Sequence, residues 1–138
     1  MPFNMIKPTA IVHVIFRLGL LACTGLGVHA SWAFTLSSGI ETQCQVQRDG
    51  KHGVATEIWS HYSDPKDRHP ELGRAVAVMR LDDEGWPTII MDGEAYKRTA
   101  KGTPAIWDFV YFHECAHAQQ PEVGEIGANC QAYIEMEK

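Results

Sequence analysis

The sequence predicts an α+β domain, in which a small β-sheet is followed by two helices. Short apolar segments bounded by turn residues occupy the middle of the chain and are typical of strands. A capped helical segment with two histidines four residues apart follows them, and a second helix-forming segment reaches the C-terminus. Because strands and helices come in separate blocks, we expect the α+β class rather than alternating α/β units.

Three segments account for the predicted strands. "RAVAVMRL" (74–81) and "TIIM" (88–91) are rich in apolar and β-branched residues, and "DDEGWP" between them is a turn signal. "VATEIWSHY" (54–62) fits either a strand or a short helix, because its periodicity does not separate the two.

Polar segments with glycine or proline predict the connections. Residues 34–53 are polar and contain several glycines, so we expect extended or loop structure there. Residues 63–73 hold two prolines among polar side chains and predict a loop. Asp92–Gly93 is a further turn signal.

The helical segments have clear ends. Thr103 suits the N-cap and Pro104 the first helical position, and a largely apolar stretch follows. The helix should run to about Gln120, because Pro121 cannot continue it. Residues 122–138 contain no proline and are rich in helix formers, which predicts the second helix.

Residues 1–30 have the layout of a secretory signal peptide. Lys7 and Arg17 occur without any acidic residue, and a short apolar run precedes small-residue cleavage sites that end at Ala30 or Ala33. The alternatives are an uncleaved N-terminal anchor and, ranked below cleavage, a lipid attached at Cys23.

Cleavage leaves residues 31–138 as a single domain, secreted or periplasmic. The formal net charge is −5, and the leader carries none of the 17 acidic residues, so the mature domain is more acidic still. An acidic domain is a poor partner for nucleic acid or for anionic membrane surfaces. We therefore expect no nucleic-acid partner and no stable membrane association after cleavage.

The segment "HECAH" predicts a metal site on the first helix. Residues four apart lie about 40° apart around a helix, so His113 and His117 can bind one ion. Glu114 projects about 100° to the side, where it can reach a zinc-bound water and act as general base and acid. The alternative is a helix with two surface histidines.

A catalytic zinc needs a third protein ligand, and no histidine follows His117. The sequence favours Glu125, at the start of the second helix, for one Zn²⁺ ion. Asn129 follows it by four residues on the same face and could orient a histidine ring. The alternative is that Glu125 is a solvated glutamate favoured by the helix dipole.

His113, Glu114, His117 and "EIGAN" from Glu125 together resemble the gluzincin metallopeptidases. "YFHECAH…GEIGANCQAY" is similar, more narrowly, to small exported bacterial proteins assigned as metallopeptidases. The resemblance covers residues 103–134 and implies a zincin-like packing, a zinc ion and a peptidase-like site. Two departures are the asparagine at 129, where gluzincins carry aspartate, and the short gap between His117 and Glu125.

The cysteines predict one disulfide in an oxidising compartment. Cys115 projects away from the face of the histidines, and a bond to Cys130 would link the two helices. Cys44 could instead pair with either of them, and a buried thiol pair is the other alternative.

The leading functional hypothesis is a zinc metallopeptidase that cleaves a peptide or protein substrate. Tyr133 is a candidate transition-state stabiliser, and His61 and His69 could be supplied from the loop region. The strand at 88–91 is either an edge strand that pairs with substrate or a core strand. The alternatives are a zinc amidase that acts on cell-wall peptides and a non-enzymatic exported binding domain with a structural or vestigial zinc site.

Overall fold

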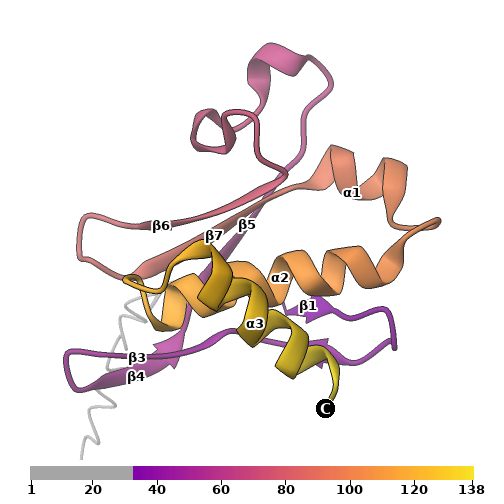
Figure 1. Cartoon of the computed structure of the whole chain (residues 1–138). Helices are drawn as coiled ribbons and strands as arrows, with labels where there is room; N and C mark the ends of the chain where they lie inside the picture. Colours follow the sequence, from indigo (N-terminus) through magenta and orange to yellow (C-terminus); the bar gives the residue numbers. More distant parts are fainter. Residues whose placement is uncertain (1–32) are drawn as a thin grey trace, which may run out of the picture.

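The computed structural model describes residues 33–138 (Figure 1). The expected signal peptide, residues 1–30, lies outside this part of the chain. The described residues contain small β-sheets followed by helices, which confirms the α+β class. Within residues 33–138, no helix is both long and apolar enough to cross a bilayer.

The strands are short and form three separate sheets. Their bounds are β1 (Phe34–Thr35), β2 (Glu41–Thr42), β3 (Gln45–Arg48), β4 (Lys51–Val54), β5 (Thr56–Ser60), β6 (Ala77–Leu81) and β7 (Pro87–Asp92). β1 pairs with β2 and β3 with β4, both antiparallel, in the region expected to be extended or loop. Asp49 and Gly50 have φ angles of 49° and 74°, and such a pair turns a tight hairpin.

The largest sheet has the strand order β5-β7-β6 (Figure 1). β5 runs parallel to β7, and β6 runs antiparallel to it. Both predicted strands are confirmed, and the ambiguous segment at 54–62 contains a strand. The edge position considered for residues 88–91 is wrong, because β7 is the central strand and Ile89, Ile90 and Met91 are all buried.

A third helix, α1 (Gly93–Thr99), was missed by the sequence analysis. The Asp92–Gly93 pair starts this helix instead of closing a turn. The Asp92 side chain accepts hydrogen bonds from the backbone N–H groups of Glu94 and Ala95, which makes it a true N-cap. A helix of seven residues leaves too little periodic pattern to recognise.

The two predicted helices are α2 (Pro104–Gln119) and α3 (Glu125–Met136). α2 ends one residue before the expected Gln120, which is its C-cap, whereas α3 starts three residues later than predicted, because residues 121–124 form the turn. α2 lies between the other elements and contacts α3, β3, β6 and β7 (Figure 1). The core is gathered around its buried side, which includes Trp107, Tyr111 and Cys115.

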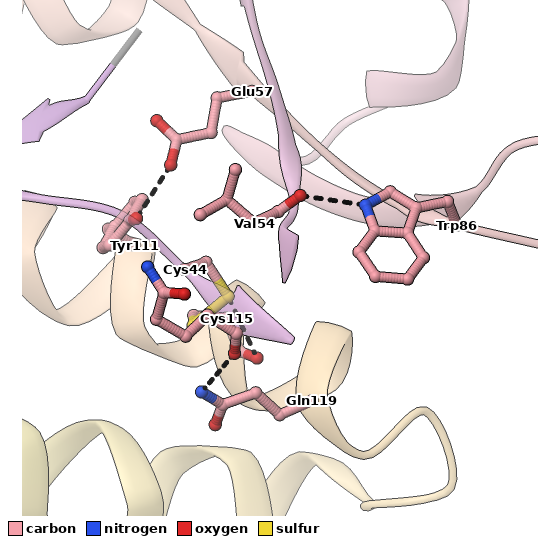
Figure 2. The surroundings of a disulfide bond; sticks show 8 residues. Cys44, Val54, Glu57, Trp86, Tyr111, Cys115 and Gln119 are labelled. Carbon is pink, nitrogen blue, oxygen red and sulfur yellow. Dashed lines mark hydrogen bonds between the residues drawn. A yellow bond between two sulfur atoms is a disulfide. The ribbon is translucent and has the colours of Figure 1, made fainter. Parts of the chain in front are cut away.

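The disulfide joins Cys44 to Cys115, with Cα atoms 5.5 Å apart (Figure 2). The predicted Cys115–Cys130 bond is therefore wrong, and within the described residues Cys130 is a free, exposed cysteine. Cys115 does point away from the two histidines, as helical geometry requires. However, α3 packs against the side of α2 that carries the histidines. The opposite side, where Cys115 lies, contacts β3, and Cys44 immediately precedes that strand.

Candidate metal centre

Two elements bring three metal-binding side chains together. His113 and His117 lie one turn apart on α2, and their Nε2 atoms are 3.2 Å apart. Glu125, the first residue of α3, places Oε2 3.2 Å from His113 Nε2 and Oε1 3.5 Å from His117 Nε2. The two histidine side chains are mostly buried, whereas Glu125 is open to solvent. This group could bind a metal ion.

Asn129 sets the orientation of His113. Its Oδ1 lies 2.9 Å from the Nδ1 of the ring. Because an amide oxygen only accepts hydrogen bonds, the ring must donate an N–H from Nδ1. The Nε2 of the neutral ring then carries a lone pair directed at His117 and Glu125, which is the form that binds a metal.

Small residues allow α3 to lie close to α2. Ala128 and Ala132 are fully buried on the side of α3 that contains Asn129. At Gly127, in the first turn of α3, an added Cβ would lie 2.5 Å from Cγ2 of Val123, so a larger residue there would have to displace that side chain. This tight return of the chain places Glu125 opposite the histidines.

Glu114 lies beside the three side chains and against the sheet. Its carboxylate faces the backbone N–H of Met79 in β6. Burial raises the pKa of Glu114, while the nearby His113 and His117 and the Met79 bond act in the opposite direction. Glu125 adds a further upward contribution to the pKa.

A cleft of about 400 Å³ opens in front of the group, between β6 and the two helices. Its lining residues are Ala75, Ala77, Val78, Met79, Arg80, His113, Glu114, His117 and Glu125. The sequence analysis found the helical half of this lining and missed the half from β6 as part of a site. A strand pattern was visible there, but no local signal shows which strand will lie beside α2.

Three other candidate residues lie outside this cleft lining. Tyr133 is exposed on α3 and packs against Phe109, with ring centroids 5.0 Å apart. His61 contacts Glu94 at the start of α1. The side chain of His69 accepts a hydrogen bond from the backbone of Glu71. None of these three side chains lines the cleft, so the structure does not place any of them where it could contact a transition state.

Comparisons of the chain with known protein families, with curated proteins and with solved structures gave no match. The function of the site is therefore inferred from its own chemistry. Two imidazoles and one carboxylate can hold a cation. The carboxylate of Glu114 stands outside this ligand group and beside it, where it can exchange a proton with a molecule in the cleft.

Proposed function

We propose that this chain is an exported zinc-dependent hydrolase, and specifically a metallopeptidase that cleaves peptide bonds. The observation that carries the proposal is the convergence of His113, His117 and Glu125 in a cleft beside Glu114. The disulfide between Cys44 and Cys115 supports export, because such bonds persist in oxidising compartments.

Zinc is the ion that this donor set fits best. Two histidines and one glutamate are an established ligand set for catalytic zinc, which leaves a fourth position open. Zinc ligands at about 2.0–2.1 Å in a tetrahedron are separated from one another by about 3.3 Å. The two Nε2 atoms are 3.2 Å apart, which fits that spacing, and the Glu125 carboxylate places one oxygen 3.2 Å from His113 and the other 3.5 Å from His117. With one donor atom from each residue, the three atoms lie within 4.8 Å of one another.

Glu114 and Asn129 would then have separate roles in the hydrolysis. A bound zinc ion supplies Lewis-acid chemistry, which makes water more acidic and polarises a carbonyl group. Glu114 takes a proton from the attacking water as its oxygen bonds to the carbonyl carbon. The same carboxyl group then gives that proton to the amide nitrogen as the carbon–nitrogen bond breaks. Asn129 keeps the Nδ1 proton of His113 in place throughout.

The test compares the wild type with Glu114→Gln after purification without chelator. We expect both proteins to hold about one equivalent of zinc, and cleavage of casein to fall at least about 100-fold in the variant. Glu122→Gln, an exposed change in the turn before α3, is the matched control and should retain activity.

Two outcomes would contradict the proposal. Full activity of Glu114→Gln would show that Glu114 is not the general base. Less than about half an equivalent of zinc in the wild type would favour a non-enzymatic binding domain. Hydrolysis of purified peptidoglycan without hydrolysis of casein would assign the site to an amidase instead.

A further inference from the structure

The unpaired side of β6 forms one wall of the cleft. Among residues 33–138, β7 is the single strand that pairs with β6. The backbone N–H of Asp92 donates to the carbonyl of Val76 at 2.8 Å, so Val76 faces β7. Because successive residues in a strand direct their backbone groups to opposite sides, Ala77 and Met79 direct theirs away from β7 and towards the cleft. An extended peptide could pair with such an edge.

The carbonyl of Ala75 is already bonded within the protein. The Nη2 of Arg68 donates to it, and Nη1 donates to the carbonyl of Gly73 at 2.5 Å. Arg68 is held in turn by Asp92, a buried carboxylate whose Oδ2 accepts from Nε at 2.9 Å. Since Asp92 also caps α1, this arginine is fixed to the centre of the fold. A substrate cannot pair with Ala75 without breaking that arrangement.

Both polar groups of the Met79 backbone face groups of the protein. Its N–H faces the carboxylate of Glu114. Its carbonyl accepts from Nη1 of Arg80 at 3.2 Å, and Glu71 holds the Nε of the same arginine at 2.9 Å. Both side chains of this pair are about half exposed, at 53% and 52%. The part of β6 that can bind a substrate backbone therefore ends at Met79. The half-exposed Arg80 blocks this end less firmly than Arg68 blocks the end at Ala75.

Ala77 lies between these two ends and lines the cleft. Its N–H and carbonyl face the cleft, and the described residues supply no partner for either group. We infer that the site needs only a short stretch of peptide and binds its backbone at one residue, through Ala77, with Arg68 and Arg80 as the residues that limit the binding edge. This inference rests on the proposed peptidase function.

The length dependence of hydrolysis tests the inference. The zinc-loaded protein is incubated with a peptide digest of casein, and mass spectrometry identifies a cleaved bond. Peptides with this bond at their centre are then synthesised with lengths from about four to about ten residues. We expect kcat/KM to change by less than about threefold across the series, because the Met79 backbone next to Ala77 is occupied and the next outward-facing residue of β6, Leu81, lies beyond the cleft lining.

A second measurement uses Arg80→Met, which frees the carbonyl of Met79. Its kcat/KM should increase by about fivefold or more from the shortest to the longest peptide, whereas Arg48→Met, a change on β3 away from the cleft lining, should behave as the wild type.

A steep rise of kcat/KM with length in the wild type would overturn the inference and leave the peptidase proposal intact. If kcat/KM of Arg80→Met did not depend on peptide length, Arg80 would not be a residue that limits the binding edge. Absence of any peptide cleavage by the zinc-loaded protein would instead contradict the proposed function itself.

Discussion

Asn129 holds the imidazole ring of His113 through one hydrogen bond of 2.9 Å. A carboxylate at this position would carry a full negative charge and polarise the imidazole more strongly than an amide oxygen does. The residue thus keeps the proton of the ring on Nδ1 while polarising the imidazole less than a carboxylate would. A moderate zinc affinity is the expected consequence.

Substitution of Asn129 should change zinc affinity in both directions. We expect Asn129→Ala to weaken zinc binding by about 10–100-fold, because the ring loses its partner, and Asn129→Asp to strengthen it. Competition with a chromophoric chelator measures both dissociation constants. Gln131→Ala, on the same helix but with its side chain bonded to Gln120, serves as the control. Equal affinities in all of these proteins would show that Asn129 does not act on the metal site.

Glu57 is a second buried carboxyl group, far from the ligands in sequence. It accepts a hydrogen bond of 2.8 Å from the hydroxyl of Tyr111, on the buried side of α2 (Figure 2). Burial raises the pKa of Glu57 above its ordinary value of 4.5, and the Tyr111 bond opposes that rise. The folded protein therefore binds a proton at Glu57 more tightly than the unfolded chain does.

The sign of this shift predicts a pH dependence of stability. Below pH 4.5 Glu57 is protonated in both the folded and the unfolded chain, so it does not lower the free energy of unfolding. As the pH rises from there through the raised pKa, the free energy of unfolding falls. Glu57→Gln keeps an acceptor for Tyr111 and has no proton to lose. The variant should therefore gain stability relative to the wild type as pH increases from about 4 to about 8, in urea unfolding. Glu84→Gln, in an exposed turn, should show no such gain.

At the scale of elements, α2 is held from two opposite sides. Its histidine side meets α3, and its other side is bonded to the start of β3 by the Cys44–Cys115 disulfide. Gln119, one turn after Cys115, also donates to the backbone carbonyl of Gln45 at 2.9 Å (Figure 2). The part of α2 that carries the two candidate metal ligands is thus anchored to a strand that contributes no such ligand.

Loss of the disulfide should lower stability without removing the ligands. The bond closes a loop between residues separated by 71 positions, so the chain-entropy estimate is about 4 kcal/mol. We expect Cys44→Ala/Cys115→Ala to lose roughly this amount in denaturant unfolding, measured with a chelator present so that zinc does not contribute. Cys130→Ser should leave stability unchanged. A drop of similar size in Cys130→Ser would show that Cys130 matters to the fold.

At the scale of the whole molecule, the proposed zinc ion would connect two helices of a small domain. α2 supplies two ligands and α3 supplies the third, so only the folded chain offers the complete set. A ligand that binds the folded state alone stabilises it by mass action, by about 2.7 kcal/mol at a concentration 100 times the dissociation constant. The proposed zinc ion should therefore contribute to the stability of the fold as well as to the proposed catalysis.

Thermal unfolding with and without zinc measures that contribution. We expect zinc to raise the Tm of the wild type by several degrees, and to raise the Tm of Glu125→Ala much less. The Glu125 side chain is 79% exposed, so its removal should not disturb packing in the metal-free protein. Magnesium, which prefers octahedral oxygen ligands, should have no comparable effect. An equal response of wild type and variant to zinc would remove Glu125 from the ligand set.

Much of the candidate site could be predicted because its members are close in sequence. His113 and His117 share a face by helical geometry alone, and the same geometry directs Cys115 to the far side. Pro104 and Pro121 bound the helix, and the short turn after it limits how far away Glu125 can lie. The strands at 74–81 and 88–91 were equally visible in their composition.

The sequence by itself determined the class of the fold, the ligand helix and the residues that can bind a metal, because these depend on interactions within one or two turns of chain. Only the tertiary structure decided that Cys44 is the partner of Cys115, that β7 is central, and that β6 borders the cleft. Those pairings join residues far apart in the chain. They follow from how whole elements pack around α2, and no local pattern of residues specifies that packing.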